Sequence, residues 1–363
     1  MFAAMYSTQA ILPEIGKTFL VSPSRAGLTI SAAVLALSAA AWLWGPFSDR
    51  FGRRRSMVLA SALLVVPSIG VALAPSFPLL LLARSLQGLC MPGLLTVGLP
   101  YVIEVSPESG GKAMGTYVTA LVFGGLIGRL GVGLLASAVG WRWAVGSLVP
   151  LPLAGAILLA ATLPQTPPAA HTPRRLEAIR EQLNNGQLLL ASCVACALFF
   201  NFVGVFSYVV FRLQARPFGL GTGTGSLIFV LWLLGTAGPA IGRLVDRFGW
   251  QRLAAVSLAV ASSGLLITLP NRLPTVVLGL ALMTLAMFTG LTAAQLGVAR
   301  STTRDRGTAS AIYISLYYAA GALGGYLPGL AWQAWRWEGV VLSGLGALGA
   351  ASLAVAAAWR KPR

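Results

Sequence analysis

Two arginines stand inside long apolar segments, where a charge needs a partner. Arg84 begins the run Arg84-Ser-Leu-Gln87-Gly88, and Arg129 lies in a glycine-rich run. A guanidinium inside a bilayer costs at least about 2.5–3.5 kcal/mol, so such a residue generally faces a cavity or a partner. With Gln87 adding hydrogen bonds, these two cations favour binding of an anionic or strongly polar small molecule.

Three interpretations of the two cations stay open. They attract a substrate; or Glu14, near the end of the first apolar segment, neutralises one of them; or they have structural roles. In the last case Arg84 snorkels to the interface and Arg129 faces backbone carbonyls. Proton exchange would need a titratable group in the pathway, and the chain offers Glu14, Asp49, Glu104 and Asp246.

The second half of the chain contains polar residues that are weaker candidates for contact with a substrate. Asn201 and Tyr208 are seven positions apart and share a helical face, and Tyr313 and Tyr317 are four apart. Interhelical hydrogen bonds or interfacial positions explain them at least as well as ligand contact. The single histidine, His171, lies in a proline-rich segment, so we expect no metal site and no cofactor.

The composition defines the class of protein that must position these residues. Of 363 residues, 56% are hydrophobic and 10% are charged, against about 25% charged in a soluble protein. Apolar runs of about twenty residues, each long enough to cross a bilayer, follow one another. The net charge of +17 does not indicate nucleic-acid binding, because the basic residues fall between the apolar runs. We expect an all-α polytopic membrane protein.

The apolar runs predict twelve helices in two bundles. Only twelve residues precede Pro13, so the first helix is either truncated or begins upstream of Met1. The predicted N-terminal bundle spans 1–163, the proline-rich linker 164–186 and the C-terminal bundle 187–363. The predicted helices are 1–16, 24–46, 56–74, 78–103, 113–137, 141–163, 187–213, 224–245, 254–270, 274–298, 309–332 and 339–359.

A charged, glycine-punctuated motif occurs once in each half. Six of the eleven residues from Gly45 to Arg55 recur 197 positions later, from Gly242 to Arg252. Glycine permits close helix approach and a tight turn, and an aspartate paired with arginines can hold one conformation and release another. The motif positions are Gly45, Asp49, Gly52, Arg53 and Arg54 in the first copy and Gly242, Asp246, Gly249 and Arg252 in the second.

The basic residues predict the orientation. One set of alternate connections holds seventeen lysines and arginines and the other holds seven. The positive-inside rule makes the first set cytoplasmic, together with the repeated motif, the linker and the C-terminus. Within the linker, Leu176, Ile179 and Leu183 share one helical face, which suits either a helix on the lipid headgroups or a solvated linker helix.

These motifs resemble the major facilitator superfamily. The resemblance implies two pseudo-symmetric six-helix bundles, alternating access, and a gating latch at the first motif that Glu104 joins. It also links Arg84 and Gln87 to proton coupling. Antiporters of the family carry G-x8-G-x3-G-P-x-x-G-G in helix 5. Here Gly115, Gly124, Gly128 and Gly133 are in register, but Arg129 replaces the proline and Val132 replaces one glycine.

The expected function is therefore transport and not enzymatic catalysis. We expect a monomeric secondary transporter in a bacterial inner membrane that exports a small molecule in exchange for protons. The alternative is uptake or exchange of an anionic metabolite through Arg84 and Arg129. An integral membrane enzyme would need clustered His, Asp or Cys residues, and a channel would not require two latch motifs.

Overall fold

Every regular element in the described part of the chain is helical. The computed structural model describes residues 1–106, 110–164, 176–237, 247–302 and 306–360. Nine of its helices are long and apolar enough to cross a membrane. Many large apolar side chains on these helices are exposed, for example Leu43 at 70% and Leu353 at 73%. Such side chains suit a surface that faces lipid hydrocarbon.

The first half of the chain contains the following elements. They are α1 (Phe2–Tyr6), the 3-10 turn η1 (Gln9–Ile11), α2 (Leu12–Phe19), α3 (Pro23–Phe51), α4 (Arg53–Leu73), α5 (Phe77–Cys90), α6 (Pro92–Val105), α7 (Gly110–Leu126), the π turn η2 (Ile127–Gly131), α8 (Val132–Val139), α9 (Trp141–Gly146) and α10 (Pro150–Thr162).

The described residues of the linker and the second half form seven further elements. They are α11 (Leu176–Leu183), α12 (Gly186–Gln214), α13 (Thr222–Ser226), the 3-10 segment η3 (Leu227–Ala237), α15 (Trp250–Ile267), α16 (Leu273–Ser301) and α17 (Arg306–Arg360). The predicted break within 309–359 is confirmed, because Trp335 and Arg336 inside α17 have non-helical backbone angles.

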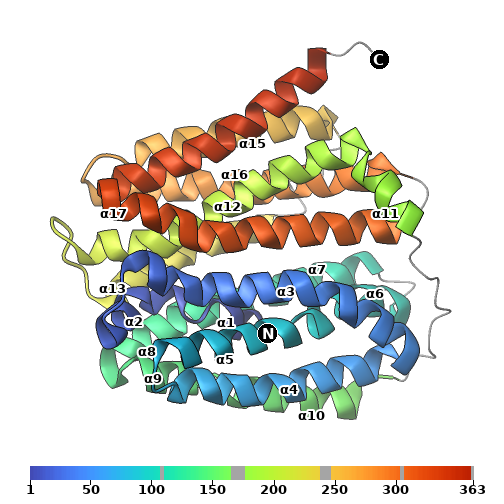
Figure 1. Ribbon diagram of the computed structural model, residues 1–363, viewed down its shortest axis with the longest axis horizontal. Helices are drawn as coiled ribbons and strands as arrows, with labels where there is room; N and C mark the ends of the chain where they lie inside the picture. The colour runs from blue at the N-terminus through green and yellow to red at the C-terminus, as the bar shows by residue number, and fades with distance from the viewer. Residues whose placement is uncertain (107–109, 165–175, 238–246, 303–305, 361–363) are drawn as a thin grey trace. The chain divides into compact units, whose positions relative to one another are not determined.

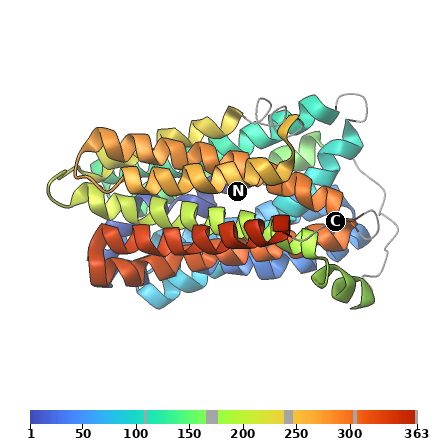
Figure 2. The same ribbon diagram turned by 90° about the horizontal axis from the view of Figure 1, so that it is seen from above.

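The helices form two compact units. Unit 1 comprises 1–22, 28–173 and 221–230, and unit 2 comprises 23–27, 174–220 and 231–363. Each unit thus includes one short segment from the other half of the sequence. In unit 2, α12 packs along α17 and α16, and α15 packs along α16; both views show these ribbons side by side (Figure 1, Figure 2).

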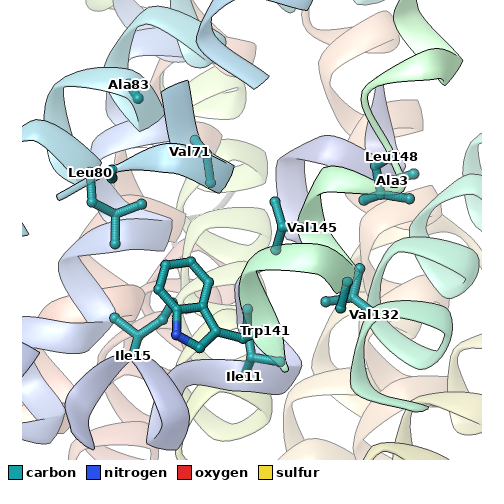
Figure 3. Packing of buried hydrophobic residues seen from close by; sticks show 12 residues of the cluster. Ala3, Ile11, Ile15, Val71, Leu80, Ala83, Val132, Trp141, Val145 and Leu148 are labelled. Atoms are coloured by element: carbon teal, nitrogen blue, oxygen red, sulfur yellow. The ribbon is translucent and has the colours of Figure 1, made fainter. Parts of the chain in front are cut away.

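The first apolar segment of unit 1 is a broken helix. Pro13 falls in the first turn of α2, where its missing N–H is tolerated, and the residues between α1 and α2 form the short turn η1. Ile11 and Ile15 belong to a buried cluster with Val71 and Trp141, which joins this segment to α4 and α9 (Figure 3). The burial of these apolar side chains stabilises the position of the broken helix within unit 1.

The linker helix α11 packs on unit 2 through small and polar residues rather than through Leu183. Ala178 and Gln182 are buried, whereas Leu183 is 48% exposed. Nearby, Asn185 caps α12 through its side chain and donates to the carbonyl of Ser301 at 2.9 Å. Small and polar residues therefore attach α11 to unit 2, next to the polar end of α16, whereas Leu183 stays exposed.

Candidate functional site

Arg84 is fully buried in unit 1 and does not snorkel. Its Nε donates to the carbonyl of Thr29 at 2.8 Å, and Nη1 donates to the carbonyl of Ala4 at 2.8 Å. Nη1 also donates to Oε1 of Gln87 at 2.6 Å, and Nη2 donates to the carbonyl of Met5. The Ala4 and Met5 carbonyls lie where α1 ends, so the guanidinium satisfies acceptors that the helix break leaves without intrahelical donors.

Arg129 lies on the π turn η2, which joins α7 to α8; these three elements together form the predicted helix 113–137, called helix 5 below. Aromatic rings and neutral oxygens surround it. Its Nε donates to Oε1 of Gln9 at 2.6 Å, and Nη1 donates to the carbonyl of Gly125 at 2.9 Å. The guanidinium carbon is 3.8 Å from the centre of the Tyr6 ring. A cation over an aromatic face is stabilised by about 2 kcal/mol when desolvated. Turns of π helix occur frequently at functional sites.

Glu14 does not neutralise either buried arginine in the described part of the chain. Its Oε1 accepts a hydrogen bond from Thr222 Oγ1 at 2.9 Å and forms an ion pair with Lys17 Nζ at 3.3 Å. The Glu14 side chain is 29% exposed. It thereby joins α2 to the first residue of α13, within unit 1.

The glycine spacing of helix 5 produces close contacts at two of its positions. A Cβ atom at Gly128 would overlap the backbone of Ala3 on α1, and one at Gly133 would overlap the side chain of Ser226 on α13. Gly124 is near Phe2 at ordinary contact distance, whereas nothing lies within 4 Å of a Cβ at Gly115. The close packing expected from the spacing is therefore present where helix 5 meets α1 and α13.

The first copy of the repeated motif forms an ion pair and a helix-end contact. Arg53 Nη2 lies 2.6 Å from Glu104 Oε1 on α6, and Arg54 Nη2 donates to the carbonyl of Ala160 near the end of α10. Gly45 and Asp49 lie inside α3, and Gly52 separates α3 from α4. The predicted approach of Glu104 to the motif is thus observed, and the ends of α4, α6 and α10 meet.

The second copy is described only in part. Gly242 and Asp246 lie outside the described residues. Gly249 directly precedes α15, as Gly52 directly precedes α4, and Arg252 lies in the first turn of α15. The two copies therefore start corresponding helices.

The polar candidates of unit 2 contact neighbouring helices. Asn201 is 2% exposed and its Nδ2 donates to the Gly344 carbonyl at 3.0 Å; Tyr208 is fully buried and donates to the Gly325 carbonyl at 2.7 Å. The ring of Tyr317 stacks on Phe199 with centroids 4.0 Å apart. These contacts join α12 to α17 and favour interhelical roles for Asn201 and Tyr208.

Sequence reasoning missed Tyr6 and Gln9, which surround Arg129. Trp141 and Trp337 are also buried, at 7% and 3% exposure. Each indole Nε1 donates to a threonine hydroxyl at 2.9 Å, Thr18 for Trp141 and Thr268 for Trp337. A hydrogen-bonded indole buries its ring without leaving a polar atom unsatisfied.

Comparison with solved structures shows the fold. A bacterial homologue of the human lysosomal transporter Spinster, in an inward-facing and occupied conformation, superposes with a TM-score of 0.77 and 18% sequence identity. The superposition covers 98% of this chain and 92% of that chain. At this identity the similarity establishes the architecture alone.

Comparison of sequences shows the family. The uncharacterised MFS-type transporter YybF of Bacillus subtilis (strain 168) is 30% identical over 349 residues, covering 94% of this chain and 86% of YybF. The inner membrane transport protein YnfM of Escherichia coli (strain K12) is 28% identical over 345 residues, covering 93% of this chain and 83% of YnfM. The sequence profile described as Major Facilitator Superfamily matches residues 1–325. The chain therefore belongs to the major facilitator superfamily.

Proposed function

We propose that the protein is a secondary active transporter that exports a small organic anion from the cytosol in exchange for protons. Membership of the major facilitator superfamily supports transport by alternating access. The close contacts of Gly128 and Gly133 support antiport, because they retain the helix 5 spacing of the family's antiporters. YnfM, an inner membrane protein, supports the same location for this chain.

The neutral groups around Arg129 are the observation that supports an anionic substrate. Gln9 and the carbonyl of Gly125, which accept hydrogen bonds from Arg129, are neutral, and so is the ring of Tyr6. Neutral groups solvate a guanidinium without cancelling its charge. A carboxylate or phosphate that reaches Arg129 therefore gains charge-assisted hydrogen bonds, which are about twice as strong as neutral ones.

Arg84 has a positioning role in this proposal. Its guanidinium is engaged by three backbone carbonyls and by Gln87, which is itself held by a 3.0 Å hydrogen bond to Ser68 Oγ. These bonds hold the broken first helix against α3 and α5. Arg84 thereby sets where Tyr6 and Gln9 stand relative to Arg129.

Glu14 is the carboxylate that we assign to proton coupling. Protonation would remove the negative charge that Lys17 and the Thr222 hydroxyl now contact. Weaker contacts there would release the first turn of α13 from α2, which links proton binding to a helix movement. Asp49 in α3 and Glu104 in α6 are other candidates, as is Asp246, which lies outside the described residues.

Transport assays in proteoliposomes test the proposal. Purified protein is reconstituted with a pH-sensitive dye inside, and organic anions, neutral sugars and organic cations are supplied under inward and outward proton gradients. We expect an organic anion to drive proton movement in the opposite direction. Proton movement in the same direction would establish symport instead, the coupling expected for uptake, which is the alternative for an anionic substrate.

Substitutions of single residues test the roles of Arg129 and Glu14 in transport. Loss of a charge-assisted hydrogen bond of about 1.5–3 kcal/mol predicts that Arg129→Met weakens anion transport at least about tenfold, and that Arg129→Lys retains part of it. Arg272→Gln, which removes an exposed charge at the start of α16, is the matched control. Unchanged KM and kcat in Arg129→Met would exclude Arg129 from the site. Glu14→Gln is expected to uncouple anion flux from the proton gradient.

A further inference from the structure

Two cysteines lie one helical turn apart on α12 of unit 2, away from the arginine site of unit 1. They are Cys193 and Cys196, and both are half-buried free thiols. Residues at this spacing share a helix face, with Cβ atoms about 5–6 Å apart, and the two sulfurs are close enough to interact electrostatically. The pair is therefore a dithiol on one face of α12, and the transport proposal gives it no role.

Two buried hydroxyl groups beside this dithiol have no hydrogen-bond partner among the described residues. They are Ser192 Oγ on α12, in a residue that is 1% exposed, and the phenol oxygen of Tyr313 on α17, in a residue that is 5% exposed. Ser192 lies one turn before Cys196 on the same face, and Tyr313 is within electrostatic reach of Cys196. Buried polar groups in proteins are nearly always satisfied. Both hydroxyls can donate to sulfur, so they indicate a place that holds a charged sulfur group.

A ladder of aromatic rings holds Tyr313 near Cys196. The ring of Tyr317 stacks on Tyr313, with centroids 6.0 Å apart, and on Phe199, with centroids 4.0 Å apart. Phe199 lies on α12 one turn after Cys196, so the ladder joins the two helices beside the dithiol. A Cβ atom at Gly321 of α17 would overlap the Phe199 ring, which shows how closely α12 and α17 pack here. The position of the Tyr313 hydroxyl is therefore fixed by packing.

The chemistry of these groups suits a soft metal ion. Thiolate sulfur is a soft ligand that selects ions such as Cu(I). Metal–sulfur bonds of about 2.3 Å place two sulfurs up to about 4.6 Å apart, which two cysteines on one helical turn can span. Each thiol releases its proton to solvent when its sulfur binds the ion. Two thiolates around a monovalent ion leave one negative charge, and the hydroxyls of Ser192 and Tyr313 stabilise it by donating hydrogen bonds to sulfur.

We propose that Cys193 and Cys196 form a binding site for a soft monovalent metal ion, with Ser192 and Tyr313 as hydrogen-bond donors to the two sulfurs. A zinc site would need four ligands, and the described residues contain no group of three or more His, Cys, Asp or Glu residues that could hold an ion. Two sulfurs suffice for a soft ion that accepts two ligands on opposite sides. This site differs from the histidine-based one that the sequence argues against.

Metal binding by the purified, reduced full-length protein in detergent tests the site. Ag(I) is the probe, because it is a soft monovalent ion that does not change oxidation state in the assay. Unbound ion is removed by gel filtration, and the metal retained per protein is measured by mass spectrometry. We expect one tightly held Ag(I) per protein and a higher unfolding temperature, because a ligand of the folded state stabilises it. Zn(II) at the same concentration should not be retained.

Serine variants of the three cysteines identify the ligands. Cys193→Ser and Cys196→Ser should each lose Ag(I) retention, whereas Cys90→Ser, which removes the half-buried cysteine of unit 1, is the matched control and should keep it. Tyr313→Phe should weaken binding about tenfold, the usual effect of losing a group that orients a metal ligand.

Alkylation of the wild-type protein gives the same information without a variant. Bound Ag(I) should protect Cys193 and Cys196 from a thiol reagent and leave the reaction of Cys90 unchanged, which peptide mapping measures. Equal retention of Ag(I) by the wild type and the Cys193→Ser/Cys196→Ser double variant, or the absence of protection at Cys193 and Cys196, would overturn the proposal. Binding by Tyr313→Phe as tight as that of the wild type would remove the hydroxyl from the site.

Discussion

Gly52 and Gly249 adopt nearly the same backbone conformation, with φ 89° and ψ 147° at Gly52 and φ 81° and ψ 150° at Gly249. They lie 197 positions apart in the sequence, and each directly precedes a helix of a different unit. This region of φ/ψ space is available almost only to glycine. The repeat seen in the sequence is therefore also a repeat of local geometry.

Replacing either glycine by alanine is expected to destabilise the unit that contains it. A Cβ atom at this φ and ψ costs about 1–3 kcal/mol, so the thermal unfolding midpoint of Gly52→Ala or Gly249→Ala in detergent should fall. Gly115→Ala is the matched control, since it lies in helix α7 with nothing within 4 Å of its Cβ position. There alanine should be neutral or stabilising by up to about 1 kcal/mol. Equal midpoints in all three variants would contradict this prediction.

Arg84→Met should affect folding, in contrast to Arg129→Met. It removes the donor to the carbonyls of Ala4, Met5 and Thr29. The Ala4 carbonyl keeps the Ser7 hydroxyl as a donor. Because each buried acceptor left without a partner costs about 1–3 kcal/mol, we expect a loss of at least about 1 kcal/mol, seen as lower yield and a lower unfolding temperature. Ser85→Ala on the same helix, whose hydroxyl bonds only its own helix, is the control. A stable Arg84→Met protein that lacks transport would assign Arg84 to the substrate or to proton coupling.

The ion pair of Arg53 and Glu104 should control the transport rate more than stability. The side chains are 17% and 41% exposed, and a pair in such a setting contributes about 0–1 kcal/mol to folding. Glu104→Gln should leave the unfolding temperature within a degree or two and change the rate about fivefold or less, because 1 kcal/mol corresponds to about that factor. The double variant Arg53→Glu/Glu104→Arg should recover part of the loss. If the swap transports no better than the single variants, the pair does not act as a latch.

Arg336→Gly should stabilise unit 2. Arg336 has φ 51° and ψ −130° within α17, a conformation that costs a residue with a Cβ about 1–3 kcal/mol. Glycine removes this strain and loses about 0.5–1 kcal/mol of chain entropy, so the net gain is about 0–2.5 kcal/mol. Thermal unfolding measures it, with Arg272→Gly, at φ −124°, as the control that should show no gain. A lower unfolding temperature in Arg336→Gly would show that the arginine side chain stabilises the break.

The sequence by itself determined the class of protein, the family and most helix boundaries. Hydropathy and helix length are properties of contiguous segments, and the repeated motif compares one segment with another, so neither needs contacts between distant residues. The approach of Glu104 to the first motif was predictable for a different reason, because the family resemblance supplied the pairing. The packing of Gly128 and Gly133 followed from their spacing.

The tertiary structure alone decided what the buried arginines contact. Arg84 and Arg129 look alike in the sequence, yet one holds carbonyls 79 and 80 positions away and the other lies over Tyr6. Backbone carbonyls are present at every residue, so a sequence carries no signal for which of them a guanidinium will reach.

Arg142 and Arg212 show the same limit of sequence reasoning. Arg142 donates to the carbonyl of Ala74 just beyond α4, and Arg212 donates to that of Thr268 just beyond α15. Each stacks on a tryptophan, Trp141 or Trp337. They occupy unrelated positions in the two halves, because any guanidinium that folding brings to a helix end can satisfy its carbonyls.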